Sequence, residues 1–341
     1  MMVLSLSQYI YNVPIGFGGG VALSNSLRAK LFKLMREDAD DFESIADDKI
    51  EEKGAASVEV NYIDNYPPFS VAMCVYGKDN PEWFDVALES VLIQTVKPAE
   101  IVLVVDGPVP DGIQHIIDKY TEICNSGGIL LQVIRFSENR GLGKALQVAV
   151  ENCNHELIAR MDSDDIAVKN RFELQLQKFK HENIDICGGQ IDEFIDDPSN
   201  VIGRRLVPVS DAELKVFMKK RCPFNHMTVM YKKSAVLNAG NYQDWFWNED
   251  YFLWIRMALK KQIFSNLPET LVNVRVGKDM YARRGGDKYF KSEVGIQKLM
   301  LKNGLIDRPT YMSNCTKRFI VQKMLPNSVR GWVFKIFARE K

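Results

Sequence analysis

Between residues 67 and 161, segments with the pattern of buried strands alternate with segments that have the pattern of amphipathic helices. The strand segments are short and almost continuously apolar, as in "EIVLVVDG", and the helix segments repeat their apolar residues at spacings of three and four. The expected strands are 69–77, 100–107, 130–136 and 155–161, and the expected helices are 80–95, 112–123 and 141–153. Such alternation predicts an α/β fold with a mostly parallel sheet covered by helices on both faces.

Polar and glycine residues gather where these predicted strands end. Tyr76 and Gly77 follow the first strand, Asp106 ends the second, and residues 139–141 and 162–165 follow the third and fourth. Ligands of parallel sheets bind in the crevice beyond the carboxyl ends of the strands. The sequence therefore predicts a ligand site at this edge.

The fourth strand runs directly into the carboxylates of Asp162, Asp164 and Asp165. Asp162 and Asp164 share a face of an extended chain, and carboxylate oxygens are the ligands that Mn²⁺ and Mg²⁺ prefer. A turn capped by these acids, with Asp165 as the N-cap of the next segment, explains the local sequence equally well. The other strand ends favour the metal reading.

Residues at two of the other strand ends suit a nucleotide. Asp106 can accept a hydrogen bond from a base or a ribose hydroxyl. Arg140, between Asn139 and Gly141 and before a predicted helix, can meet phosphate with its charge and with backbone N–H groups, and Lys144 lies one turn along.

The ordered blocks "FSVAMCVYGKD", "SVLIQTVKPAEIVLVVDGP", "ENRGLGKALQVAV", "ARMDSDDIA" and "NEDYFLWIRMA" resemble those of bacterial family 2 glycosyltransferases. The resemblance is closest to the branch that builds O-antigen, capsule and exopolysaccharide, and it spans residues 67–286. It implies a GT-A fold and a metal-dependent, inverting transfer of a sugar from a nucleotide sugar, most often a UDP-sugar. The enzyme would be a hexosyl- or N-acetylhexosaminyltransferase.

The resemblance also implies roles for single residues. Asp162 and Asp164 match the Asp-x-Asp motif, and Asp250 in "NED" matches the catalytic base, with Glu249 beside it. Arg283 and Arg284 lie on a loop that would close over the donor on the hinges Gly285 and Gly286. Residues that match or adjoin nucleotide-sugar positions are Tyr76, Gly77, Asp106, Asn139, Arg140, Lys144 and Asp162.

On the acceptor side the expectations are weaker, and alternatives stay open. His226 in "PFNHMTV" either touches the acceptor or packs as a structural histidine. Trp245 and Trp247 either stack on sugar rings or belong to the core, and Trp254 is expected in the core. Glu249 is expected to be a helix-start acid rather than the base.

Some features depart from the family pattern. Many relatives carry two acids where this chain has Asp106 alone, and the QxxRW signature of processive synthases is absent, which indicates a single transfer. The alternative functions are a nucleotidyltransferase of related fold and a non-catalytic nucleotide-sugar-binding protein.

The charges and cysteines limit the partners and the compartment. The 44 basic and 44 acidic residues balance, so no overall field favours nucleic acid. The six cysteines have no CxxC spacing and are expected to be reduced thiols of a cytosolic protein. We expect no export and no membrane span.

The basic C-terminus predicts contact with a membrane. Residues 326–341 have the pattern of a basic amphipathic helix, which can either lie on an anionic membrane or dock on the catalytic body. Membrane contact suits an acceptor carried on a polyprenyl diphosphate, which the resemblance implies, at the inner face of the cell membrane.

The expected organisation has four parts. Residues 1–66 form an extension of unknown role, 67–168 bind the nucleotide sugar, 169–285 bind the acceptor and carry the base, and 286–341 are helical and basic.

Overall fold

The computed structural model of the protein describes residues 66–277 and 286–324. The predicted extension 1–66 (Tyr66 apart) and the amphipathic tail 326–341 lie outside the described residues. The strands are β1 (Phe69–Tyr76), β2 (Glu100–Asp106), β3 (Leu130–Arg135), β4 (Leu157–Met161), β5 (Ile166–Ala167), β6 (Ile186–Phe194), β7 (Gly203–Arg205), β8 (Met230–Lys232) and β9 (Phe264–Arg275). The helices are α3 (Pro81–Leu92), α4 (Asp111–Gly127), α5 (Leu142–Asn152), α6 (Arg171–His181), α7 (Asp211–Met218), α8 (Lys233–Asn238), α9 (Glu249–Leu259), α10 (Asp287–Lys302) and α11 (Arg308–Phe319), with short turns η1 (His226–Thr228) and η3 (Ile320–Met324).

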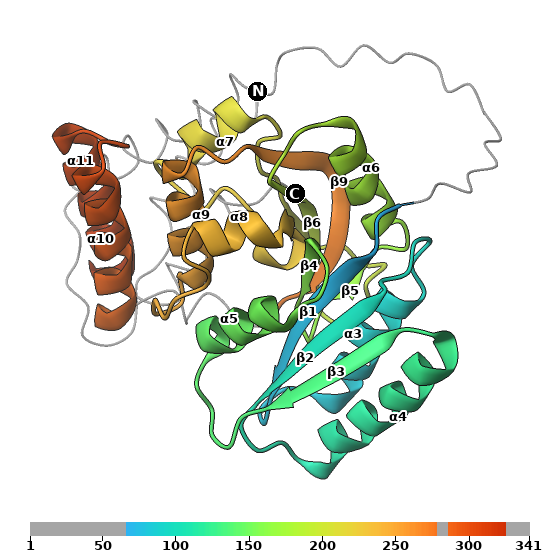
Figure 1. Cartoon of the computed structure of the whole chain (residues 1–341). Coiled ribbons are helices and arrows are strands. Elements are labelled where there is room, and N and C mark those ends of the chain that lie inside the picture. The colour runs from blue at the N-terminus through green and yellow to red at the C-terminus, as the bar shows by residue number, and fades with distance from the viewer. Residues whose placement is uncertain (1–65, 278–285, 325–341) are drawn as a thin grey trace, which may run out of the picture. The chain divides into compact units, whose positions relative to one another are not determined.

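One sheet of nine strands runs through the described body in the order β3-β2-β1-β4-β8-β6-β9-β5, and β7 pairs with β6. Strands β3, β2, β1 and β4 are parallel, as predicted from the alternation of strands and helices (Figure 1). The strand β8 is antiparallel to β4 and β6, so the two predicted halves contribute strands to the same sheet. The predicted α/β class is confirmed.

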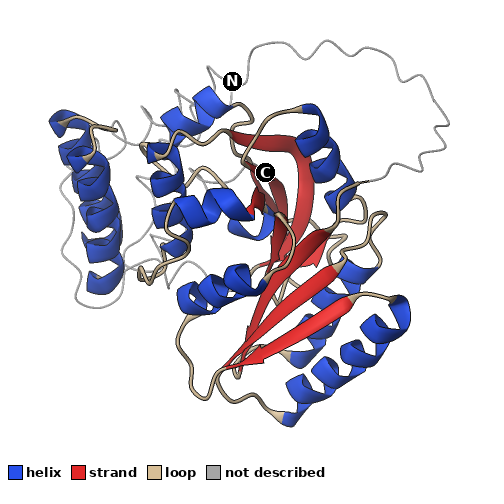
Figure 2. Ribbon diagram, viewed as in Figure 1, coloured by secondary structure: helices blue, strands red, loops and turns tan. Residues whose placement is uncertain are grey.

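Helices cover both faces of this sheet, because apolar side chains of each strand point alternately to the two sides. Val71, Met73 and Val75 of β1 face the core shared with α3 and α4, whereas Ala72 faces the core shared with α5 and α9. The two helical layers flank the red strands in Figure 2. Asn80 caps α3, since its side chain accepts hydrogen bonds from the N–H groups of Glu82 and Trp83.

The second half of the sheet contains one long strand that the sequence pattern did not reveal. β9 pairs in parallel with β6 over most of its length, with register shifts near Gln190. Its sequence, "FSNLPETLVNVR", contains proline and several polar residues, so it lacks the apolar run or the alternation that marks a strand.

The described C-terminal residues form the helices α10 and α11, as the expected helical C-terminal part requires. Within residues 66–277 and 286–324, none of the helices combines the length and the apolar character needed to cross a bilayer.

Candidate functional site

The ends of β1 and β2 bring the first predicted site residues together. Tyr76 and Asp106 are paired in the parallel register, and Tyr76 is 38% exposed. At Gly77 a Cβ atom would lie 2.6 Å from the carbonyl oxygen of Pro108, so only glycine permits this approach of the two strand ends.

Asp106 is buried, and its carboxylate holds the loop before α5. It accepts hydrogen bonds from the backbone N–H of Arg140 at 2.6 Å and of Gly141 at 2.9 Å, and Asn139 donates to its carbonyl oxygen at 3.3 Å. From the sequence, the Asp106 carboxylate and these N–H groups are each expected to contact a nucleotide. The structure instead pairs them with each other, so Asp106 shapes the loop.

Two basic side chains, one in this loop and one in the first turn of α5, take different positions. The guanidinium of Arg140 lies 5.0 Å from the centre of the Phe136 ring, and Arg140 is exposed. The ammonium of Lys144 donates to the Gln147 amide at 2.9 Å. Arg140 therefore presents its charge to solvent at the edge of the sheet.

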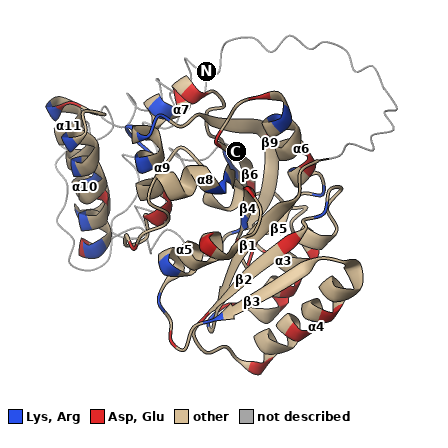
Figure 3. Ribbon diagram, in the orientation of Figure 1, with Lys and Arg blue, Asp and Glu red and all other residues tan. Residues whose placement is uncertain are grey.

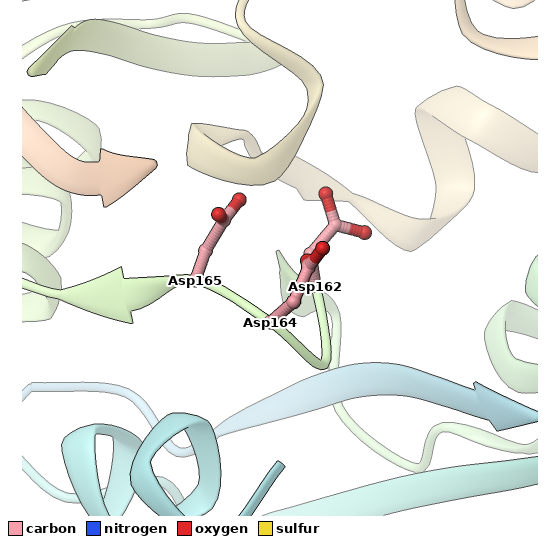
Figure 4. Close-up of side chains that lie close together, drawn as sticks. All are labelled: Asp162, Asp164 and Asp165. Atoms are coloured by element: carbon pink, nitrogen blue, oxygen red, sulfur yellow. The ribbon is translucent and has the colours of Figure 1, made fainter. Parts of the chain in front are cut away.

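Asp162, Asp164 and Asp165 form a carboxylate cluster in the turn after β4. One oxygen atom from each lies within 4.8 Å of the others, and the three side chains leave the same side of the turn (Figure 4). Burial and the neighbouring carboxylates of Asp162 and Asp79 raise the pKa of Asp164 to about 7. Half-buried and buried carboxylates that repel one another suit a hard divalent cation, so the cluster fits Mn²⁺ or Mg²⁺.

Asp165 does not cap a helix, which corrects one of the two sequence readings. It precedes the strand β5 rather than a helix, is 2% exposed and accepts a hydrogen bond from the N–H of Arg275 at 2.9 Å. Burial raises the pKa of Asp165 well above its usual value. Its partner is 110 residues away in sequence, which explains why a local pattern could not identify it.

Sequence reasoning missed Asp79, which ties the turn after β1 to the aspartate cluster. Its carboxylate accepts from the N–H of Tyr76 at 3.1 Å and from the Ser163 hydroxyl at 2.8 Å. Burial raises the pKa of Asp79 to about 6. The ends of β1 and β4 are thus connected through one side chain.

Arg160 was also missed, although a charged residue inside the apolar strand "LIARM" is a visible signal. Its side chain is 2% exposed and forms an ion pair with Asp162 through Nη2. A buried cation therefore lies directly behind the aspartate cluster.

The predicted base, Asp250, lies in the first turn of α9 and is half-buried. Burial raises its pKa, and hydrogen bonds from the Tyr251 N–H and the Cys222 thiol lower it. The Cys222 Sγ lies 3.4 Å from the Asp250 carboxylate, a contact for which the sequence holds no signal. Arg205 fixes Cys222 in turn by donating to its carbonyl oxygen at 2.8 Å.

The start of α9 meets the start of α5, which follows the loop held by Asp106. A Cβ atom on Gly143 would lie 3.4 Å from the Glu249 Cβ and 3.2 Å from the Gln243 carbonyl oxygen. Glu249 is the first residue of α9, as expected of a helix-start acid, and burial raises its pKa to about 7. The structure thus brings the loop of the first half next to the predicted base of the second.

The predicted acceptor residues lie near α9 in different environments. Trp254 is fully buried, as expected, and half-buried Trp245 stacks on Phe252 with ring centres 4.1 Å apart. Trp247 is 48% exposed, has a φ of 56° and stacks on Phe246, which the sequence analysis missed.

His226 is half-buried and packs against its neighbours. Its Nε2 lies 2.9 Å from the Tyr242 hydroxyl, and burial lowers its pKa well below the usual value. These contacts favour the packing alternative, and contact with an acceptor stays a prediction.

Most of the loop predicted to close over the donor lies outside the residues that the structure describes. Arg283, Arg284 and Gly285 are not among the described residues, and Gly286 precedes α10 with a φ of 91°. Their roles stay predictions.

Sequence comparison finds a matching family and relatives of this chain. The sequence model of the family described as "Glycosyl transferase family 2" matches residues 70–246. An "Uncharacterized glycosyltransferase" of Haemophilus influenzae is 38% identical over 273 residues, which cover 80% of this chain and 99% of the relative. The Escherichia coli "UDP-Gal:alpha-D-GlcNAc-diphosphoundecaprenol beta-1,3-galactosyltransferase" is 34% identical over 273 residues, which cover 80% of this chain and 97% of that protein.

A solved structure shares the fold. The mannosyltransferase PcManGT of Pyrobaculum calidifontis, solved with GDP-Man and Mn²⁺, superposes with a TM-score of 0.59 at 13% identity, over 91% of this chain and 84% of that one. The expected GT-A fold is confirmed.

Proposed function

The chain belongs to glycosyl transferase family 2, and we propose that it moves one sugar from a UDP-sugar to a hydroxyl group of a lipid-linked oligosaccharide, with inversion at the transferred carbon. The printed name of the Escherichia coli relative contains both a UDP-sugar and an acceptor on diphosphoundecaprenol, which supports this choice of substrates. The observation that supports the proposal is the contact between the starts of α5 and α9, because the loop 139–141, proposed to bind the donor, precedes α5, and Asp250, the proposed catalytic base, lies in the first turn of α9.

The donor would lie over the ends of β1, β2 and β4. Tyr76 is exposed there and can pack against the nucleobase of the donor, while Arg140 offers an unburied charge to the donor diphosphate. Asp106 and Asn139 keep the loop in the shape that presents Arg140, and Lys144 lies one turn further along. Arg283 and Arg284 would add positive charge to the leaving diphosphate.

Asp162 and Asp164 would hold Mn²⁺ or Mg²⁺, and such a cation offsets negative charge on a diphosphate leaving group. The raised pKa of Asp164 supports this assignment, because burial and repulsion between carboxylates leave the cluster in need of positive charge. Asp165 completes the oxygen cluster, although its own hydrogen bond goes to Arg275.

Asp250 would act as the base. The acceptor hydroxyl oxygen forms a bond to the anomeric carbon while Asp250 takes its proton, and the bond from that carbon to the diphosphate breaks on the opposite face. A carboxylate whose pKa is raised by burial takes up a proton more readily than a solvated aspartate does. Glu249, at the helix start, and the exposed ring of Trp247 would border the acceptor.

Replacing Asp250 with Asn tests the base. We expect the transfer rate to fall by about 10²- to 10⁴-fold, the usual contribution of a general base, with UDP–Mn²⁺ binding unchanged. Glu249→Gln is the comparison, because it removes the adjacent carboxylate that would border the acceptor. It should change the KM of the acceptor more than kcat, whereas Asp250→Asn should lower kcat. Near-normal turnover by Asp250→Asn would exclude Asp250 as the base.

Replacing Asp164 with Ala tests the cation site. The variant should lose Mn²⁺-dependent UDP binding in calorimetry, because Asp164 would be a direct ligand. Unchanged binding would exclude that role.

Peripheral contact with the inner face of the cell membrane would give access to a lipid-linked acceptor. Besides the basic tail, α10 supports this contact, since its exposed lysines at 288, 291, 298 and 302 follow helical spacing along one side (Figure 3). Deleting residues 326–341 should weaken binding to vesicles that contain anionic lipid, and Lys298→Glu with Lys302→Glu should weaken it further. Undiminished binding of both proteins would exclude the membrane contact.

A further inference from the structure

Arg160 lies on the face of β4 that packs against α5 and α9. Its neighbour two residues earlier, Ile158, belongs to the core on that face, and its neighbour two residues later is Asp162. Successive side chains of a strand alternate between faces, so Arg160 and Asp162 point to the same side. This explains why the guanidinium reaches Asp162 at the strand end.

The guanidinium is poorly satisfied for a group so deeply buried. Within the described residues, Nη2 pairs with Asp162, whereas the buried Nε and Nη1 have no hydrogen-bond partner. Burying a charge with unpaired donors is unfavourable, and a whole buried ion pair can often be replaced by apolar residues of similar volume without loss of stability. Packing alone therefore does not account for an arginine at this position.

Arg171 shows what a fully structural buried arginine looks like in the same protein. It is 0% exposed, and it donates to the Gln175 amide at 3.1 Å and to the Arg160 carbonyl oxygen at 2.7 Å. Its described hydrogen bonds go to uncharged acceptors, whereas Arg160 contacts a carboxylate of the aspartate cluster. The two residues are therefore a matched pair for experiments.

We propose that Arg160 is a positioning residue that holds the Asp162 carboxylate in the orientation in which it binds the cation of the donor complex. The inference rests on the proposed function, because it takes Asp162 to be a ligand of Mn²⁺ or Mg²⁺. One oxygen of Asp162 is engaged by Arg160, which leaves the other for the cation. Side chains that orient metal ligands in this way commonly contribute roughly 10- to 100-fold to metal affinity.

The charge of Arg160 also reaches the other half of the site. Burial raises the pKa values of Glu249 and Asp250, and the positive charge of Arg160 lowers both. The same charge lowers the pKa of Asp164, which burial and two carboxylates raise. Arg160 thus lies where one fixed cation acts on the aspartate cluster and on the start of α9 together.

The test compares Arg160→Met, Arg160→Lys and Arg171→Met with wild type. The dissociation constants of Mn²⁺ and of UDP with Mn²⁺ are measured by calorimetry, and the melting temperature of each metal-free protein is measured separately. Because the variant leaves Asp162 without its buried partner, we expect Arg160→Met to melt below wild type but to stay folded at the assay temperature. We expect it to bind Mn²⁺ with UDP about 10- to 100-fold more weakly. Arg160→Lys, which keeps the charge without the planar fork, should recover part of the affinity. Arg171→Met should lose stability but not affinity.

Wild-type affinity in Arg160→Met would overturn the proposal. Tighter Mn²⁺ binding would overturn it too, because Arg160 would then act only by repelling the cation. If Arg160→Met does not fold, the comparison of Arg160→Lys with Arg171→Lys decides, and equal affinities overturn the proposal. Failure of the wild type itself to bind UDP with Mn²⁺ would instead refute the proposed cation site, and Arg160 would fall with it.

Discussion

The clearest quantitative prediction concerns Asp106→Asn. The Asp106 carboxylate accepts two backbone hydrogen bonds, at 2.6 Å from Arg140 and at 2.9 Å from Gly141. The asparagine side chain is nearly the same size but has one oxygen acceptor and one NH₂ donor. One backbone N–H therefore loses its acceptor and faces another donor.

The magnitude follows from those two bonds. A hydrogen bond to a charged group contributes roughly 1.5–3 kcal/mol, and a donor left unsatisfied costs roughly 1–3 kcal/mol. Because the loop is only partly buried, we expect a net loss of about 2–4 kcal/mol in the free energy of unfolding. At roughly 2–4 °C per kcal/mol, the melting temperature should fall by about 4–16 °C.

The assay is thermal unfolding of the metal-free protein together with calorimetry of UDP with Mn²⁺. Glu138→Gln is the control, because it neutralises an exposed acid in the same loop. We expect Asp106→Asn to lower both the melting temperature and the UDP affinity, since the released loop no longer presents Arg140. An unchanged melting temperature with reduced UDP affinity would refute the reasoning and show that the carboxylate contacts the nucleotide directly.

Two further predictions concern the base and the loop. The base works only when ionised, so the transfer rate is lost as pH falls through the pKa of Asp250. Cys222→Ala removes a hydrogen bond that lowers this pKa, so the acid limb of the kcat/KM profile should move to higher pH. An acid limb at the wild-type pH would show that the contact has no role in setting this pKa. Gly107 has a φ of 89°, and a Cβ atom added there would lie 2.7 Å from the Asn139 nitrogen. Gly107→Ala should therefore reduce UDP affinity and lower the free energy of unfolding by more than the roughly 1–2 kcal/mol of left-handed backbone strain. Gly128→Ala is its control, with a φ of 69° and no atom within 4 Å, and equal losses of stability and UDP affinity in the two variants would contradict the steric argument.

Much of the fold could be predicted because its signals are local. The strands β1, β2 and β4 are buried on both faces, which leaves continuous apolar runs in the sequence, and the intervening helices repeat their apolar residues at helical spacing. β9 escaped prediction because its polar residues and its proline remove both signals.

The sequence by itself determined at which edge of the sheet the proposed site lies. Parallel strands bring their carboxyl ends to one edge, so the polar residues that follow apolar runs identify that edge without any structure. It also determined the residue types at this edge, which are aspartates with oxygen ligands, basic residues and glycines.

Only the tertiary structure decided which of these groups contact one another. Asp106 engages N–H groups 34 and 35 residues away, Cys222 reaches Asp250 across 28 residues, and Asp165 is bonded to a residue 110 positions away. Periodicity reports which face of an element is buried, but it carries no information about the element packed against that face. The pairing of Arg160 with Asp162 depends on both the sequence and the tertiary structure. The spacing of two residues places the side chains on one face, and the packing of α5 and α9 buries the charge.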